Sequence, residues 1–247
     1  MWSISEVKER GKTVFKANYW KSVLVALVLS VCAGGAGAGA SNSVKSEDLQ
    51  NQFSELSPEQ MMIILFAILG VIGVAVTIGE LIKIFALNPL SIGCYGFFKD
   101  NNQSDGRADL NGLLDGFKKN YLHNVLTVFL KDLFLALWTC LFIIPGIIMA
   151  YAYRMVPYIL RDNPELAPME VIKKSKEMMK GNKWQAFVYD LSFIGWILLT
   201  IITCGIVGVF YLSPYKENAD AQLYMTLSGQ NNAVTSNPYD SDQNTTF

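Results

Sequence analysis

Two acidic residues lie within long apolar segments, where their charge could take part in chemistry. Asp132 precedes Gly146 by 14 residues, and Asp190 precedes Gly205 by 15. At about 1.5 Å per residue, each carboxylate would lie about 21 Å below turns at these glycines, in the inner third of a bilayer. Charge at such depth is costly and often functional, so the two acids could line a cavity for a cation, a proton or a polar substrate. We favour the alternative that each pairs with a basic residue of a neighbouring interfacial helix and fixes that helix to the bundle.

Further ionisable residues accompany these acids. Lys131 adjoins Asp132, and Glu80 precedes Lys83 by three residues, a spacing that places both side chains on one helix face. Together with Asp190 these four residues form the candidate intramembrane polar site.

The sequence offers little support for catalysis or metal binding. His123 is the only histidine, and its sequence context does not suggest a catalytic triad. The cysteines are scattered without a C-x-x-C motif, which argues against a zinc site and a disulfide framework. They are Cys32, Cys94, Cys140 and Cys204. We therefore expect a protein that is not an enzyme and needs no metal or cofactor, with a membrane-embedded enzyme as the less favoured alternative.

The composition indicates a membrane protein. Of the 247 residues, 51% are hydrophobic and 17% charged, and the mean hydropathy is +0.28. The net charge of -1 gives no indication of a nucleic-acid partner. A membrane span needs about 20 apolar residues, and four runs are long enough. They cover residues 19–40, 61–87, 121–153 and 186–212.

The positions of the basic residues favour six crossings over four. Cytoplasmic flanks carry an excess of Lys and Arg, and the segment before the first run is basic whereas the loop after it is acidic. The N-terminus is therefore expected in the cytoplasm. If the third run turns at Pro145-Gly146 and the fourth at Cys204-Gly205, every basic segment and the C-terminus also lie there. The last arm, residues 206–213, is short for a full crossing.

A threefold internal repeat supports these hairpins. Each unit opens with an amphipathic segment that ends at Asn18, Asn120 or Asn182, and an apolar span follows. An Asp-Leu-x4-Trp motif occurs in the second and third units, and each unit has a proline after its returning arm, namely Pro89, Pro157 and Pro214. The sequence thus predicts an all-α transmembrane fold with about six membrane helices, arranged as three repeats of an amphipathic interfacial helix plus a helical hairpin.

The chain is predicted to form one integral membrane domain over residues 1–228. The repeats cover about 3–99, 107–165 and 167–228, and the first contains an extracellular insert at about 41–60. Residues 229–247 are polar and carry no Lys or Arg, which predicts a disordered tail.

The amphipathic segments are rich in lysine, and each well-placed lysine could contribute about 1 kcal/mol to binding anionic headgroups. These helices could lie at the lipid boundary, or could be cytoplasmic helices packed on the bundle. The candidate lipid contacts are Lys8, Lys12, Lys16, Lys118, Lys119, Lys173, Lys174, Lys176 and Lys180.

Several of these motifs resemble one known family. They are Asn120-Tyr121, the turn at 142–149, YAYRMVPYILRDN at 151–163, KEMMKGNKW at 176–184, and Pro214-Tyr215. Over about residues 1–228 the chain resembles the bacterial multi-pass membrane family called domain of unknown function 975. The resemblance implies a bacterial plasma-membrane location and a six-helix plan, and it implies no activity.

We therefore expect a non-enzymatic membrane protein that organises lipids or binds a partner, which could be another membrane protein or a second copy of itself. The alternative is a transporter or permeation pathway that uses Asp132 and Asp190. Internal repeats and buried acids are typical of transporters, although three repeats that face the same way differ from the usual inverted pair.

Overall fold

The computed structural model describes residues 2–33, 57–118 and 120–230. Most of the predicted insert, Lys119 and the tail from residue 231 lie outside these ranges. Within them the chain is helical and contains no strand, which confirms the all-α prediction.

Each described segment of the chain is a series of helices. Their bounds are α1 Ile4–Ala17, α2 Tyr19–Cys32, α4 Pro58–Ile82, α5 Asn88–Gln103, α6 Asp115–Lys118, α7 Tyr121–Leu141, α8 Ile143–Tyr153, α9 Val156–Asp162, α10 Pro168–Met178, α11 Lys183–Leu191, α12 Ile194–Ile202 and α13 Ser213–Leu227. Shorter elements are the π-helices η2 Lys83–Leu87 and η4 Gly208–Leu212 and the 3-10 helix η3 Leu110–Leu114.

Four helical stretches of the described chain are long and apolar enough to cross a membrane. They are Glu59–Gln103, Tyr121–Leu141, Ile143–Asp162 and Lys183–Ile202. The pair formed by α1 and α2, bent by 107°, would be a fifth if it counts as one span. Helices of this length and apolar composition are what a membrane protein requires. The sixth crossing stays a prediction.

The third apolar run folds as a hairpin of α7 and α8. The break occurs at Phe142, whose backbone is extended, and not at the expected Pro145-Gly146. Pro145 lies in the first turn of α8, where a missing N–H leaves no helical hydrogen bond unmade. Gly146 lets the two arms approach, because a Cβ there would lie 2.8 Å from the Cα of Thr139.

The fourth run turns where the sequence predicts. After α12, Cys204 and Gly205 both adopt the left-handed conformation, with φ of 50° and 89°. Glycine takes this conformation without steric cost, so it can end one arm and begin the next. The returning arm continues through η4 into α13.

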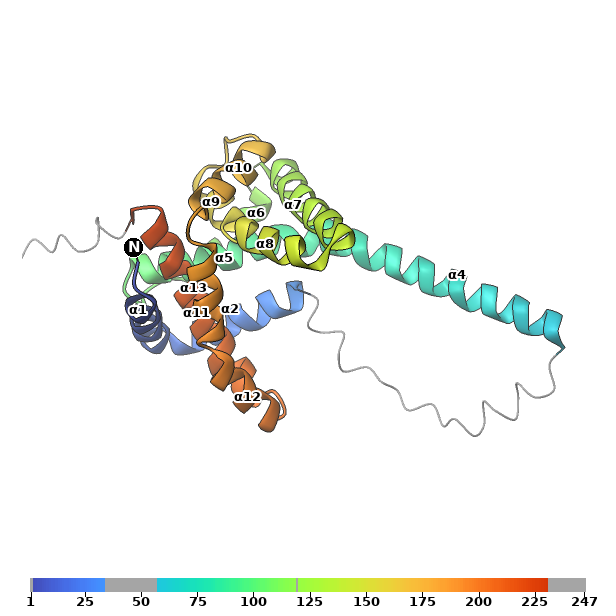
Figure 1. Cartoon of the computed structure of the whole chain (residues 1–247), viewed down its shortest axis with the longest axis horizontal. Helices are drawn as coiled ribbons and strands as arrows, with labels where there is room; N and C mark the ends of the chain where they lie inside the picture. Colours follow the sequence, from blue (N-terminus) through green and yellow to red (C-terminus); the bar gives the residue numbers. More distant parts are fainter. Residues whose placement is uncertain (1, 34–56, 119, 231–247) are drawn as a thin grey trace, which may run out of the picture.

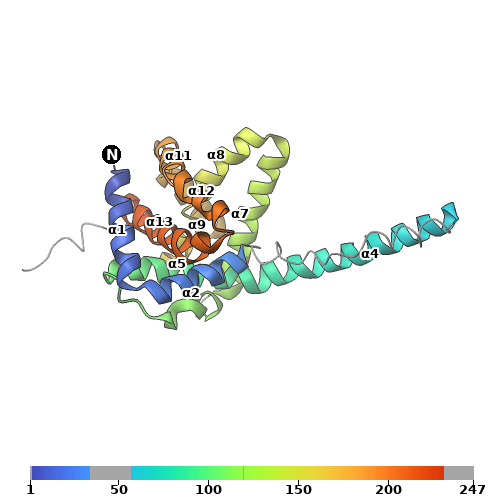
Figure 2. The same ribbon diagram turned by 90° about the horizontal axis from the view of Figure 1, so that it is seen from below.

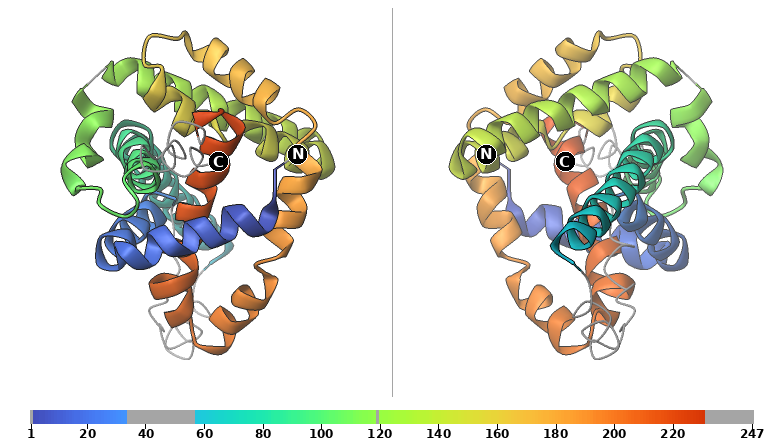
Figure 3. Two further views of the ribbon diagram at one scale, coloured as in Figure 1. Left: turned by 90° about the vertical axis from the view of Figure 1, so that its left-hand side faces the viewer. Right: turned by 90° about the vertical axis from the view of Figure 1, so that its right-hand side faces the viewer.

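The core lies around α5 and α13. Helix α13 packs against α1, α2 and α5, and α5 also contacts α9. Figures 2 and 3 show α13 among the other helices, with α1 across it. Gly11 permits the close approach of α1, since a Cβ there would lie 2.6 Å from the Cα of Ala219. Large side chains fill this core: Phe15, Phe97, Phe98, Tyr158, Leu223 and Met225.

Helix α4 has a different environment. It extends away from the other helices (Figure 1), and none of the most apolar window in its span is buried. A Cβ added at Gly70, Gly73 or Gly79 would meet no other atom within 4 Å. A helix that is apolar on every side needs lipid or another protein around it.

Candidate functional site

Arg154, Asp190, Lys216 and Asp220 form a cluster of alternating charge, which we call the ionic quartet. Arg154 directly follows α8, Asp190 lies near the end of α11, and the other two lie on α13. Lys216 and Asp220 are four residues apart, so they share one face of their helix. The quartet therefore joins three helices that are separated in sequence.

The geometry gives every carboxylate oxygen of the quartet a charged partner. Arg154 donates two hydrogen bonds to Asp190, from Nη1 to Oδ2 at 2.9 Å and from Nη2 to Oδ1 at 3.0 Å. Its Nη2 also donates to Asp220 Oδ1 at 2.7 Å. Lys216 Nζ lies 3.2 Å from Asp190 Oδ1 and 3.0 Å from Asp220 Oδ2. Such forked, charge-assisted bonds are strong and directional.

Two tyrosines complete the ligation. The hydroxyl of Tyr151 donates to Asp190 Oδ2 at 3.0 Å, and that of Tyr189 donates to Asp220 Oδ1 at 2.8 Å. Two cations thus balance two anions, and each carboxylate oxygen of both acids has at least one partner. This arrangement can hold helices together, but it leaves neither acid free to act as a base.

The charges of the quartet determine how the groups on α13 ionise. Burial would raise the pKa of Asp220, but Arg154 and Lys216 together lower it to about 2. Burial would lower the pKa of Lys216, but the three acids Asp220, Asp190 and Glu217 together outweigh burial and raise it. Glu217 behaves differently, because burial and the neighbouring Asp220 raise its pKa to about 7 against the opposing effects of Lys216 and Arg154.

The two predicted aspartates have different partners. Asp190 belongs to the quartet, but its basic partners follow α8 or lie on α13 and do not come from an interfacial helix as expected. Asp132 pairs instead with its sequence neighbour Lys131 at 2.9 Å, and its side chain is 38% exposed. Their equivalent positions in the sequence repeat therefore do not give them equivalent surroundings.

The predicted pair on the second apolar run lies apart from the bundle core. Glu80 is near the end of α4 and Lys83 begins η2, and their charged atoms are 3.7 Å apart. Both side chains are exposed, so this pair contributes little to holding the helices together.

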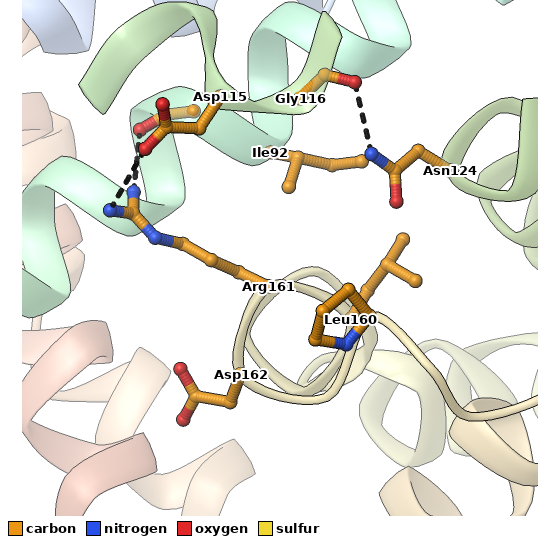
Figure 4. Close-up of a pocket in the computed structure, with 9 residues that line it drawn as sticks. Ile92, Asp115, Gly116, Asn124, Leu160, Arg161 and Asp162 are labelled. Carbon is orange, nitrogen blue, oxygen red and sulfur yellow. Dashed lines mark hydrogen bonds and ion pairs between the residues drawn. The ribbon is translucent and has the colours of Figure 1, made fainter. Parts of the chain in front are cut away.

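A second group of charges lines a pocket of about 360 Å³ (Figure 4). Arg161 Nη2 lies 2.6 Å from Asp100 Oδ2 and 3.7 Å from Asp115 Oδ2. Across the pocket, Asn124 donates to the carbonyl of Gly116 at 2.9 Å. The lining residues are Ile92, Gly93, Asp115, Gly116, Asn124, Leu160, Arg161, Asp162 and Pro164. Asp115, Asn124 and Arg161 supply the polar side chains of this lining, together with Asp162.

The amphipathic helices α1 and α10 turn their apolar faces to the bundle. Val7, Val14 and Phe15 are buried on α1, as are Val171 and Ile172 on α10. Protein thus covers the apolar face of α1, in agreement with the alternative of helices packed on the bundle. On α10, Met169 is 55% exposed, so the cover is partial there.

The candidate lipid-binding lysines differ in their surroundings. Lys8 donates to the Ser192 carbonyl at 3.2 Å and hydroxyl at 3.0 Å, and Lys174 donates to Asn163 at 3.2 Å. Lys118 and Lys173 lie 3.8 and 4.0 Å from acids of their own turns, and Lys176 lies over the Tyr153 ring. The exposed lysines are Lys12 and Lys16 on α1, Lys173, Lys174 and Lys176 on α10, Lys180 just after α10, and Lys118 on α6.

Sequence reasoning missed most of the quartet. In the sequence Arg154 is simply one of the basic residues that follow the third apolar run, and Lys216 and Asp220 lie beyond the apolar runs in a helix of ordinary polarity. The spacing of Lys216 and Asp220 was the one available signal, since it is typical of a helical ion pair. Among the described residues, no three His, Cys, Asp or Glu side chains are grouped so that they could hold a metal ion.

Comparison with protein families gives one match. Residues 140–231 match the family described as "Protein of unknown function (DUF975)". The match confirms the resemblance to domain of unknown function 975, and it covers α8 to α13, which contain the whole ionic quartet. Comparison with curated proteins and with solved structures gave no match.

Proposed function

We propose that this chain is a multi-pass protein of the bacterial cell membrane, without enzymatic activity, that organises lipids or binds a partner protein. The observation that carries the proposal is the contrast between its surface and its interior. Large apolar side chains are exposed along α4, α7, α8 and α12. In the interior, the charged groups of the ionic quartet form ion pairs with one another. Contiguous exposed apolar surface is typical of contact with membrane or protein.

The proposed architecture has six crossings in three repeats, with both termini in the cytoplasm. One feature of the helices supports the repeat. In α5, α9 and α13, proline is the second residue, at Pro89, Pro157 and Pro214. In the first and third units a π-helix, η2 or η4, immediately precedes the proline-containing helix. Proline at the start of a helix is favoured because its N–H is not required there.

The proposed lipid interaction uses the exposed lysines of α1 and α10, and Lys180 just after α10. Because the apolar faces of these helices are mostly buried in the bundle, the lysines would contact headgroups by charge and not by insertion. Each would contribute about 1 kcal/mol near an anionic surface, an effect that salt weakens.

Native mass spectrometry of the full chain, reconstituted with anionic and zwitterionic lipids, tests this proposal. We expect anionic lipid to be enriched on the protein, and high salt to reduce the enrichment. Replacing Lys12, Lys16, Lys173 and Lys180 with Gln should reduce it strongly, whereas Lys131→Gln serves as the control and should leave it unchanged. Equal retention of both lipids by the wild-type chain would contradict the proposal.

A permeation pathway that uses Asp132 and Asp190 is the second candidate function, because both acids lie within apolar segments of the chain. Flux of ions or solutes into proteoliposomes, measured for the wild-type chain and for Asp132→Asn and Asp190→Asn, distinguishes the two. Wild-type flux that the substitutions abolish would support a pathway. Loss of stability without any wild-type flux would leave the binding function.

A further inference from the structure

Helix α4 and the residue after its end carry two opposite charges in an otherwise apolar stretch. No charged residue occurs from Met61 to Gly79, and Glu80 and Lys83 then follow with apolar residues on both sides. Their side chains are 58% and 42% exposed, and their charged atoms lie 3.7 Å apart. Charged side chains within a membrane span almost always face protein and pair there. In the described chain this pair projects from a helix that its own bundle does not cover.

One face of α4 combines small residues with this charge. Gly70, Gly73 and Thr77 follow one another at intervals of three and four residues, and Glu80 continues the series. The Thr77 hydroxyl donates to the Gly73 carbonyl at 2.8 Å, so its donor is satisfied within the helix. Intervals of three and four residues place side chains along one seam, as in a coiled coil. We call this face the α4 seam, and it consists of Ile63, Phe66, Gly70, Gly73, Thr77 and Glu80.

The glycines of the seam lack the close neighbour that a helix glycine has elsewhere in this fold. A Cβ at Gly116 would lie 2.0 Å from the carbonyl oxygen of Pro89, whereas one at Gly70 or Gly73 would meet no atom within 4 Å. Glycine lowers helix propensity, and within the chain itself no packing compensates for it here. Small residues on one face of a membrane helix let a second helix approach closely, and this contact drives association where the hydrophobic effect does not.

A second copy of the chain offers the complementary face. Two copies in one membrane have the same orientation, so a two-fold axis along the membrane normal sets their α4 helices parallel and each seam residue beside its counterpart. Lys83 of each copy then faces Glu80 of the other, and two cations alternate with two anions. The seam is accessible for this contact, because α4 extends away from the bundle (Figure 1) and every residue from 65 to 82 is exposed.

We propose that the α4 seam is a homodimer interface, in which the small residues bring two α4 helices into contact and the Glu80 and Lys83 pairs of the two copies neutralise one another. The proposal rests on the partner-binding part of the proposed function and names a second copy of this chain as the partner. The interface is separate from the lysines of the proposed lipid contacts.

Energy transfer between donor- and acceptor-labelled full chains in liposomes, over a range of protein-to-lipid ratios, tests the pairing. We expect wild-type chains to pair, and Gly70→Ile to raise the dissociation constant about tenfold or more, because the larger side chain holds the helices apart. Alanine is itself a small interface residue, so isoleucine is the informative substitution. Gly79→Ile is the matched control, since Gly79 lies about two and a half turns after Gly70 and thus on the opposite face, and it should leave pairing unchanged.

Charge reversal tests the contact between the copies. Glu80→Lys and Lys83→Glu should each weaken pairing, because the charges that meet across the axis are then alike. Mixing the Glu80→Lys chain with the Lys83→Glu chain should restore pairing, because each chain then meets opposite charges in the other. A role of these charges within one chain does not predict this recovery. All variants should keep the wild-type melting temperature under dilute, monomeric conditions, because α4 lies outside the core.

Three results would overturn the proposal. They are wild-type chains that stay separate at every protein-to-lipid ratio, equal losses of pairing in Gly70→Ile and Gly79→Ile, and a mixture of the two charge variants that does not recover. The first result would show that lipid alone covers α4. Enrichment of anionic lipid is measured separately by native mass spectrometry, so a monomer that still retains anionic lipid would contradict the homodimer and leave the lipid-binding function in place.

Discussion

The guanidinium group of Arg154 bonds two aspartates from different helices, Asp190 on α11 and Asp220 on α13. Its side chain is only 14% exposed, so its removal would leave two acids in the interior with Lys216 as their one remaining cation. We expect Arg154→Ala to lower the free energy of unfolding by about 3–5 kcal/mol, as is typical when one partner of a buried ion pair is removed. Chemical denaturation in detergent measures this change.

Two further variants make the Arg154 experiment specific. Arg154→Lys keeps the charge but cannot form the planar fork, so it should recover only part of the stability. Lys173→Ala removes an exposed cation that lies 4.0 Å from Glu177, and it should change stability little. Equal effects of Arg154→Ala and Lys173→Ala would show that the quartet does not hold the helices together.

Asp220 makes the stability of the fold depend on acid. The pKa of Asp220 is about 2 in the folded chain, below its ordinary value of 3.8. Its ionised form therefore stabilises the fold above about pH 4, and this stabilisation is lost as the pH falls through about 2. Unfolding measured from about pH 6 to about pH 2 should show this loss in the wild-type chain. Asp220→Asn should be less stable at neutral pH and show a weaker acid dependence, and an unchanged profile would contradict the assignment.

At the scale of single residues, the sequence predicted only those charged site residues that interrupt an apolar segment. Asp190 is conspicuous because it interrupts an apolar segment. Arg154 follows an apolar segment, where basic residues are expected at a membrane boundary in any case. Lys216, Glu217 and Asp220 lie in a helix whose composition resembles that of a soluble protein. Which of these charges meet depends on how α8, α11 and α13 pack, and no local pattern encodes that.

Glycines permit two close helix contacts, and alanine substitutions test them at the scale of elements. A Cβ at Gly11 would lie 2.6 Å from the Cα of Ala219, and one at Gly93 would lie 1.8 Å from the carbonyl oxygen of Leu113. Both obstacles are backbone atoms, so whole segments would have to move. We expect Gly11→Ala and Gly93→Ala each to lower the free energy of unfolding by about 1–3 kcal/mol.

Gly73→Ala is the matched control for these two substitutions. Gly73 also lies in a helix, but a Cβ there would meet nothing within 4 Å. Alanine exceeds glycine in helix propensity by about 1 kcal/mol, so this substitution should be neutral or stabilising. Thermal unfolding of the three variants in one detergent provides the measurement, and similar losses in all three would rule out the packing explanation.

The elements themselves were largely predictable, and their junctions less so. Apolar periodicity and turn residues located the arms of both hairpins, because these signals are local. The sequence predicts the turn at Pro145, three residues after the break that the structure has at Phe142. The difference arises because proline is favoured just inside a helix start as well as in a turn. The sequence analysis found no signal for the π-helices η2 and η4, which immediately precede the helices that contain Pro89 and Pro214.

At the scale of the whole molecule, helix length limits how the chain can lie in a bilayer. The continuous helix Glu59–Gln103 has 45 residues, which at about 1.5 Å each gives about 67 Å, over twice the hydrocarbon thickness. The exposed apolar part, α4, is long enough to cross alone. Helix α5 buries polar residues such as Asn101 and Asn102 against its neighbours, so it is the part expected beyond the membrane.

The cysteines provide the test of the six-crossing arrangement. Cys140 precedes the turn between α7 and α8, and Cys204 lies in the turn after α12, and both are exposed, whereas Cys32 and Cys94 are buried. If both hairpins point outward, as the distribution of basic residues predicts, a membrane-impermeant thiol reagent added to intact cells should label Cys204, and Cys140 in so far as its turn reaches water. Cys204→Ser and Cys140→Ser, singly and together, assign the labelled sites. Labelling of Cys204 only after the cells are opened would place that turn in the cytoplasm. The six-crossing arrangement would then be wrong, and a cytoplasmic location could no longer explain the basic segment around α10.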